Sequence, residues 1–97
     1  MTNKSQKELI SIVLSFYNEE EVLPELINRI RSVFKELDYH HELVFVNDCS
    51  TDNSLDVLLK CSQGSDDIKI LNTSRNFGIM PCIFAGIEVT TGDAVIY

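Results

Sequence analysis

Three short polar clusters, each directly after an apolar segment, hold the side chains of this 97-residue chain that could bind a ligand. They are YNEEE at residues 17–21, NDCSTDN at residues 47–53 and NTSRNFG at residues 72–78. Asn, Asp and Ser also cap helix N-termini, and glutamates suit the positive end of a helix, so capping explains any one cluster taken singly. The clusters indicate a binding site only if the fold brings them together.

The residue types in these clusters favour a nucleotide as the ligand. An Asp at a strand end, such as Asp48, can accept hydrogen bonds from a nucleobase N–H or from ribose hydroxyls. Tyr17 could stack on a base, and Arg75 could contact a phosphate. Because Asp52 follows Asp48 by four residues, one carboxylate can cap a helix while the other faces the ligand.

Alternating strand and helix patterns would position these clusters. LISIVLSF is a near-continuous apolar run rich in β-branched residues, which is typical of a strand buried on both faces. The next stretch carries its apolar residues on one helical face, with Pro24 in the first turn. We expect His40 and His41 in an exposed turn before the second strand. The full pattern predicts strands at residues 9–16, 42–46, 68–72 and 94–97, and helices at residues 22–39, 54–61 and 80–90.

This β-α-β-α-β-α-β order with short connections predicts an α/β, Rossmann-like fold. Its sheet should be mainly parallel, with helices on both faces. Ligands of such sheets bind outside the carboxyl ends of the strands, so all three clusters should converge there. The sequence stops as the fourth strand begins. We therefore expect a sheet truncated at that strand, preceded by a polar tail at residues 1–8.

Composition and motifs argue against several classes of protein. A net charge of −7 without any Lys/Arg run disfavours nucleic acid as a partner. Neither G-x-G-x-x-G nor G-x-x-x-x-G-K-[ST] is present, which disfavours dinucleotide-binding enzymes and P-loop NTPases. Three cysteines without C-x-x-C spacing argue against a disulfide framework or a zinc ribbon, and favour the reducing cytosol. An acidic protein that binds a phosphate ligand needs a divalent metal, helix N-termini or isolated basic residues to compensate the charge.

Three segments, in their order and spacing, resemble a known family. SIVLSFYNEEEVLPEL, VFVNDCSTDNS and SRNFGIMPCIFAGIEVTTGDAVIY are similar to the N-terminal half of family 2 glycosyltransferases of GT-A fold. The nearest group is the polyprenyl-phosphate glycosyltransferases, which include dolichol-phosphate mannose synthase and bactoprenol glucosyltransferase. Residues 9–97 would then be the N-terminal, nucleotide-sugar-binding part of an incomplete GT-A domain.

The resemblance implies nucleotide-binding roles for residues of all three clusters. The residues that match the family's loops are Phe16, Tyr17, Asn18 and Glu19 over the nucleoside, Asp48 at the base, and Arg75, Asn76 and Gly78 at the floor of the nucleotide and sugar site. Asp93 matches the start of the next strand, where a structural role and a ligand contact are both open.

The sequence departs from the family pattern at three places. Asn47 stands where Asp is common, which Asp48 can compensate. Cys49 stands where Gly is common, so either that position does not require a positive φ or Cys49 is strained there. Residues 79–81, Ile-Met-Pro, are less polar than usual, which leaves contacts from the start of the third helix open.

The resemblance also implies an activity for a full-length parent. That parent would transfer a sugar, with inversion, from a UDP- or GDP-sugar to a polyprenyl phosphate or related acceptor, at the cytoplasmic face of the membrane. The family's Asp-x-Asp motif, which holds Mg²⁺ or Mn²⁺ against the diphosphate, would fall just beyond Tyr97, as would the catalytic residues. We expect the chain alone to hold no metal, to bind nucleotide weakly and not to catalyse transfer. An exposed edge of the truncated sheet could allow self-association.

Two alternatives stay open at this point. One is a non-catalytic nucleotide-binding or partner-binding module. The other is a receiver domain, which needs a phosphoacceptor Asp at the end of the third strand and a Lys after the fifth. The third predicted strand ends in Asn72 instead, so the glycosyltransferase reading is favoured.

Overall fold

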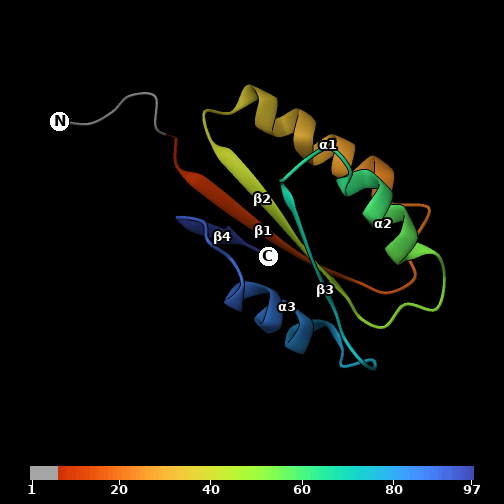
Figure 1. Ribbon diagram of the computed structural model, residues 1–97. Helices are drawn as coiled ribbons and strands as arrows, with labels where there is room; N and C mark the ends of the chain where they lie inside the picture. The colour runs from red at the N-terminus through yellow and green to blue at the C-terminus, as the bar shows by residue number, and fades with distance from the viewer. Residues whose placement is uncertain (1–6) are drawn as a thin grey trace.

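Four strands and three helices alternate along residues 7–97, the part of the chain that this computed structural model describes (Figure 1). The elements are β1 (Leu9–Phe16), α1 (Leu23–Glu36), β2 (His40–Asn47), α2 (Ser54–Ser62), β3 (Ile68–Asn72), α3 (Ile79–Glu88) and β4 (Ala94–Ile96). Their order confirms the predicted succession of strands and helices. Of the polar tail predicted at residues 1–8, residues 1–6 lie outside the described part.

The four strands form one parallel sheet in the order β3-β2-β1-β4. Strand ends are in register, because Phe16 pairs with Asn47 and Asn47 pairs with Asn72. The chain moves outward from β1 through β2 to β3 and then returns to place β4 on the other side of β1. Such a reversal is the switch point at which open α/β sheets bind ligands. The three polar clusters therefore begin at one level of the carboxyl edge.

Helices cover both faces of the sheet, as the sequence predicts: α1 and α2 lie on one side and α3 on the other (Figure 1). The buried residues of the first core are Phe16, Leu23, Ile27, Leu43, Phe45 and Leu58. Those of the second core are Val13, Val44 and Ile83. Residues 42–47 of β2 are all buried because the strand is central and is covered on both faces.

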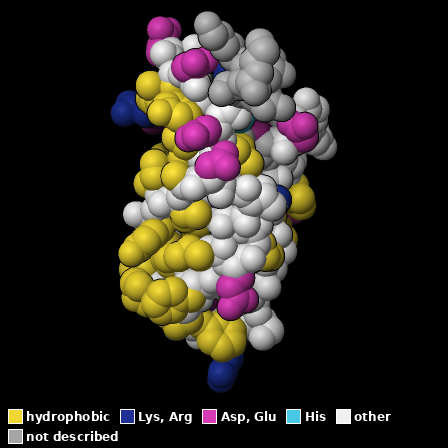
Figure 2. Space-filling model, turned by 90° about the vertical axis from the view of Figure 1, so that its left-hand side faces the viewer, with side chains coloured by type: hydrophobic (Ala, Val, Ile, Leu, Met, Phe, Trp, Pro, Cys, Tyr) yellow, Lys and Arg dark blue, Asp and Glu magenta, His cyan; other side chains and the backbone are white. Residues whose placement is uncertain are grey.

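The outer side of α3 and the edge strand β4 expose large hydrophobic side chains. Figure 2 shows hydrophobic side chains gathered on this part of the surface. The exposed residues of these two elements are Ile79, Met80, Phe84, Val95 and Ile96. Strand β4 is exposed along its whole length, and the self-association expected through a sheet edge stays a prediction.

The prediction of an exposed turn at His40 and His41 is wrong, because β2 begins at His40. Both residues pair with the start of β1, and this pairing extends the strand beyond its apolar core. The His41 ring is stacked on Phe34, with ring centroids 4.8 Å apart. Its Nε2 lies 2.8 Å from Oδ2 of Asp67.

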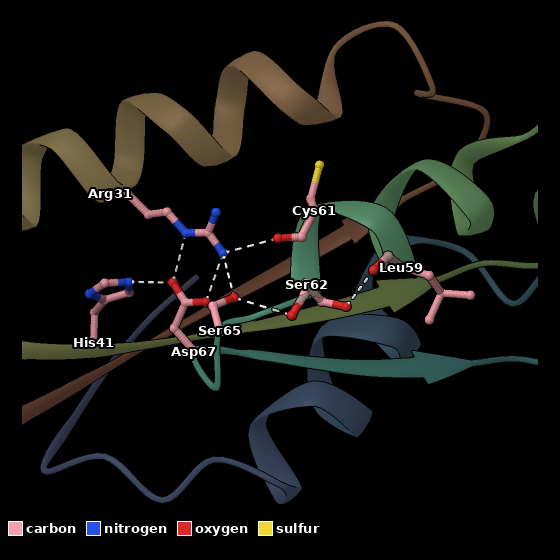
Figure 3. A network of polar contacts seen from close by, with 7 residues as sticks. All are labelled: Arg31, His41, Leu59, Cys61, Ser62, Ser65 and Asp67. Carbon is pink, nitrogen blue, oxygen red and sulfur yellow. Dashed lines mark hydrogen bonds and ion pairs between the residues drawn. The ribbon is translucent and has the colours of Figure 1, made fainter.

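Asp67 is the centre of a polar network at the amino edge of the sheet (Figure 3). Nε and Nη2 of Arg31, on α1, donate to the two oxygens of Asp67 over 2.9 and 2.8 Å. The guanidinium of Arg31 holds the pKa of the Asp67 carboxyl well below its usual value. This Arg31–Asp67 network ties α1 to the segment that precedes β3, at the edge opposite the polar clusters.

Candidate functional site at the carboxyl edge

Main-chain hydrogen bonds join the ends of the three strands. The Asp48 N–H donates to the Phe16 carbonyl over 2.9 Å, and the Thr73 N–H donates to the Asn47 carbonyl over 3.0 Å. Asn47 Nδ2 also donates to Asn72 Oδ1 over 3.0 Å. These hydrogen bonds hold the starts of the three loops in fixed positions relative to one another.

Asn18 fastens the first loop to the second. Its Oδ1 accepts the N–H groups of Thr51 and Asp52 over 2.8 and 3.2 Å, and its own N–H donates to Ser50 Oγ over 3.0 Å. The residue has a φ of 53°, which Asn tolerates better than most residues. Asn18 is therefore engaged with protein atoms, and its predicted contact with a nucleotide stays a prediction.

Asp52, in the second cluster, and the adjacent Ser54 accept main-chain N–H groups near the helix starts, although the N-cap residues of α1 and α2, Val22 and Asn53, make no capping hydrogen bond through their side chains. Asp52 Oδ1 accepts the Ser54 N–H over 2.9 Å at the start of α2. Ser54 Oγ in turn accepts the Glu19 N–H over 2.8 Å. The contact with the Ser54 N–H thus accounts for Asp52 but leaves Asp48 to be explained.

Asp48 holds the third loop in place. Its Oδ1 accepts the Phe77 N–H over 2.8 Å, and its Oδ2 accepts the Gly78 N–H over 3.0 Å. These two N–H groups hold the pKa of the Asp48 carboxyl below its usual value. In the same loop, Asn76 Nδ2 donates a hydrogen bond to the main-chain carbonyl of Asp48. The Thr73 hydroxyl, 3.3 Å from Oδ1, and the Cys82 thiol also contact this carboxylate. A ligand N–H or O–H could take the place of these weaker side-chain donors on Asp48.

A hollow of about 270 Å³, which we call the edge hollow, opens beside Asp48. Its lining residues are Ser15, Phe16, Tyr17, Glu19, Asp48 and Ile79. Four of these are predicted site residues. The Tyr17 side chain is 45% exposed, so its ring is accessible to a planar ligand. The hollow is close to the lower limit of typical small-molecule sites.

Arg75, Asn76 and Gly78 lie on the loop that Asp48 holds, next to the edge hollow. The Arg75 guanidinium lies over the Phe77 ring, 4.7 Å from its centroid. Arg75 is exposed, so it is accessible to an anion. Gly78 has a φ of 95°, a conformation that a residue with a Cβ adopts only with strain.

Ser15 and Ile79 are the two lining residues that the sequence interpretation did not include. Ser15 interrupts the apolar run of β1 one residue before its end, and this interruption is the signal that could have identified it. Ile79 belongs to the unusually apolar segment 79–81 and brings a hydrophobic side chain to the hollow. Asp93, in contrast, lies at the amino edge, where its Oδ2 accepts the Leu9 N–H over 2.7 Å.

The two cysteines near this edge differ in environment. Cys49 has a φ of 59°, which confirms the strained alternative for this position. Cys82 is buried on α3, and burial, together with the Asp48 carboxylate, raises the pKa of its thiol to about 11. Cys82 is consequently a packing residue at neutral pH.

Residues 7–97 provide no group of three or more His, Cys, Asp or Glu side chains that could hold a metal ion. The carboxylates here are committed to main-chain N–H groups or are dispersed, so they do not fit a divalent metal. Within the same residues, no helix is both long and apolar enough to cross a bilayer.

Comparison with known proteins identifies relatives that match almost all of this chain. The sequence model of the family described as glycosyl transferase family 2 matches residues 11–97. An uncharacterised glycosyltransferase of Synechocystis is 44% identical over 87 residues, which are 90% of this chain and 27% of that protein. The undecaprenyl-phosphate 4-deoxy-4-formamido-L-arabinose transferase of Pseudomonas syringae is 40% identical over 92 residues, 92% of this chain and 27% of that protein.

Solved structures show the same fold. A mannosyltransferase from Pyrobaculum calidifontis, in complex with GDP-Man and Mn²⁺, superimposes with a TM-score of 0.78 at 20% identity, over 93% of this chain and 26% of that one. Residues 1–349 of S. aureus TarS with UDP-GlcNAc give a TM-score of 0.75 at 26% identity, over 93% and 25% of the respective chains. The chain thus spans about a quarter of the length of the proteins it matches. Its parallel sheet has the GT-A arrangement of their N-terminal part, and the match over residues 11–97 shows that the chain belongs to glycosyl transferase family 2.

Proposed function

We propose that this chain forms the nucleoside-binding part of an enzyme that transfers a sugar from a UDP- or GDP-sugar to a polyprenyl phosphate. The observation that carries the proposal is the edge hollow, where Tyr17 and Asp48 meet beyond the carboxyl ends of the neighbouring strands β1 and β2. Family membership supports a sugar nucleotide as the ligand. The name of the Pseudomonas syringae relative supports a lipid phosphate as the acceptor.

The chemistry of the hollow suits a nucleoside. The exposed Tyr17 ring provides a face for the base, and the Ile79 side chain contributes apolar contact. Asp48 is ionised because two main-chain N–H groups stabilise its charge, so it can accept from a base N–H or a ribose hydroxyl. Phe16, Asn18, Glu19 and Asn76, the other predicted site residues near the hollow, would contact this ligand or hold the loops around it.

The diphosphate needs positive charge that this acidic chain supplies sparingly. Arg75 is exposed on the loop beside the hollow and can contribute one charge. A bound Mg²⁺ or Mn²⁺ would stabilise the leaving diphosphate, but residues 7–97 do not assemble a site for it. Its ligands in the proposed enzyme would have to come from other residues.

A phosphate acceptor would make the transfer reaction easier to catalyse than a hydroxyl acceptor. A lipid phosphate is already ionised near neutral pH, so it needs less help from a general base than a sugar hydroxyl does. Positioning of donor and acceptor would then provide much of the rate enhancement. A lipid acceptor would bring the enzyme to a membrane, and we propose its cytoplasmic face.

Release of nucleoside diphosphate tests this function. A protein that carries this chain and continues for the length of its relatives is incubated with UDP- or GDP-sugars, with and without undecaprenyl phosphate. We expect release of UDP or GDP that depends on the lipid phosphate, and loss of most of it in Tyr17→Ala. Tyr39→Ala is the matched control, because Tyr39 has a similar exposure, 42% against 45%, and does not line the hollow. Nucleotide binding without release under any of these conditions would favour the non-catalytic module instead.

A further inference from the structure

A buried carboxylate at the amino edge of the sheet is not used by the proposed site. Glu42 lies in β2 with a relative exposure of 6%, on the α3 face of the sheet. It is an ion-pair partner of Lys69, with Oε1 and Nζ 2.9 Å apart. Burial alone would raise its pKa, but the Ser11 hydroxyl, the Thr91 N–H and the Lys69 ammonium together lower the pKa to about 2. Because several partners stabilise the charge of Glu42, we infer that its side chain is held in one position.

The partners of Glu42 include the turn between α3 and β4. Its Oε2 accepts the Thr91 N–H over 2.6 Å and the Ser11 hydroxyl. Ser11 Oγ then accepts the Gly92 N–H over 2.9 Å. Lys69 donates to the Val89 carbonyl over 3.0 Å, at the end of α3. Glu42 and its partners Ser11 and Lys69 thus connect β2, β1 and β3 to Thr91, Gly92 and Val89 of the turn, respectively.

The turn lies so close to β1 at Gly92 that no side chain fits at this position. A Cβ on Gly92 would lie 2.8 Å from the Ser11 main-chain nitrogen and 2.9 Å from the Leu9 carbonyl oxygen. The following residue, Asp93, exchanges two hydrogen bonds with Leu9, each of 2.7 Å. Strand β4 starts directly after this contact.

Strand β4 has little else to hold it. It is three residues long, and all three are exposed. It pairs with β1 alone, from Ile10 opposite Ala94 to Ile12 opposite Ile96. A slip of one residue would exchange the faces of all its side chains. The register of this short edge strand therefore depends on the turn that Glu42 holds.

From these contacts we infer that Glu42 is a positioning residue that sets the register of β4 against β1. The strand runs toward the carboxyl edge beside β1, whose Ser15 and Phe16 line the edge hollow. In a longer protein in which β4 extended further, the added residues would run alongside the end of β1 toward the proposed nucleotide site. This last consequence rests on the proposed function; the control of register does not.

Amide hydrogen exchange followed by NMR tests the inference on this chain. Glu42→Gln keeps the size of the side chain but removes the negative charge that the Lys69 ammonium and the Thr91 N–H bind. We expect the amides of residues 92–96 to exchange about 10- to 100-fold faster, the effect of losing hydrogen bonds to a charged group. Amides in the centre of β2 should keep their protection relative to global unfolding.

Asp67→Asn is the matched control. Asp67 is a half-buried carboxylate of the amino edge that, like Glu42, is paired with a cation. Its partners are Arg31, His41 and Ser65 (Figure 3), none of which belongs to β4 or to the turn before it. A selective release of residues 92–96 in Glu42→Gln and not in Asp67→Asn supports the inference. Unchanged exchange in β4, or equal release in both variants, overturns it.

A milder variant covers the case in which Glu42→Gln does not fold. Ser11→Ala removes one hydroxyl that both Glu42 and the Gly92 N–H use. Faster exchange confined to residues 92–96 then supports the inference, and unchanged exchange there overturns it. In the longer enzyme, Glu42→Gln should slow sugar transfer while leaving UDP or GDP affinity unchanged, and Asp67→Asn should do neither. If the wild-type enzyme transfers no sugar but the exchange result holds, the proposed function fails and the positioning role stands.

Discussion

Replacing Cys49 by glycine should stabilise the chain, because the backbone at this position has a φ of 59°. In this left-handed region a residue with a Cβ is strained by about 1–2 kcal/mol. Glycine removes that strain but loses more conformational freedom on folding, which costs about 0.5–1 kcal/mol. These ranges leave a net gain of up to about 1.5 kcal/mol, and about 0.75 kcal/mol at their centres. For a domain of this size the central value corresponds to a rise in Tm of about 3–6 °C.

The assay is thermal and urea unfolding of Cys49→Gly and Cys49→Ala, followed by far-UV circular dichroism under reducing conditions. Cys49→Ala removes the sulfur but keeps the Cβ, so the difference between the two variants isolates the backbone effect. Equal or lower stability of Cys49→Gly relative to Cys49→Ala would refute the reasoning.

A second residue with positive φ should respond in the opposite direction. Asn18 has a φ of 53°, but its side chain accepts from the N–H groups of Thr51 and Asp52. Asn18→Gly loses these hydrogen bonds, each of which contributes about 0.5–1.5 kcal/mol. The relief of strain is small because Asn tolerates this conformation. We expect a net loss of about 1–2 kcal/mol in the same urea titration.

Three further perturbations test the packing, the third loop and the buried charge. Gly86→Ala would place a Cβ against the Val13 side chain and should lower the free energy of unfolding by about 1–3 kcal/mol, measured by urea titration. Asp48→Asn should release the loop that its carboxylate holds, so that trypsin cleaves after Arg75 faster than in the wild type. The pKa of Glu42 is lowered from 4.5 to about 2, so its contribution to stability is complete above about pH 4.5 and is lost as the pH falls toward 2. Urea midpoints between these pH values should fall less steeply in Glu42→Gln than in the wild type.

The sequence was sufficient to predict the elements and their arrangement. Every predicted strand and helix is present, because the apolar periodicities are strong and because short β-α-β connections allow few topologies. The convergence of the three clusters followed from the same rule. Strand ends that are in register, such as Phe16 with Asn47, then place the clusters at one level.

The sequence could not predict contacts between residues that are distant along the chain. His40 and His41 were expected in a turn, but pairing with Leu9 and Ile10 makes them part of β2. Asp48 was assigned to the base, and nothing local shows that Phe77 and Gly78, about thirty residues away, donate to its carboxylate. In both cases, a contact between residues distant in sequence determines the local structure.

The polar residues within apolar strands were the signal that the sequence interpretation did not use. Ser11 and Glu42 are buried polar residues within the largely apolar strands β1 and β2, and they pair with each other across these strands. A buried polar group needs a partner, so such interruptions predict a network even where its other members are unknown.

The measurement that tests the central claim most directly is a titration of the ¹⁵N-labelled chain with UDP and with GDP, followed by ¹H–¹⁵N correlation spectra. The account predicts that millimolar nucleotide shifts the amides of Tyr17, Asp48 and Gly78, and that Tyr17→Ala weakens binding about 5- to 150-fold, the effect of losing one base stack. No shifts with either nucleotide, or shifts confined to the amino edge around Asp67, would contradict the assignment of the edge hollow as the nucleoside site.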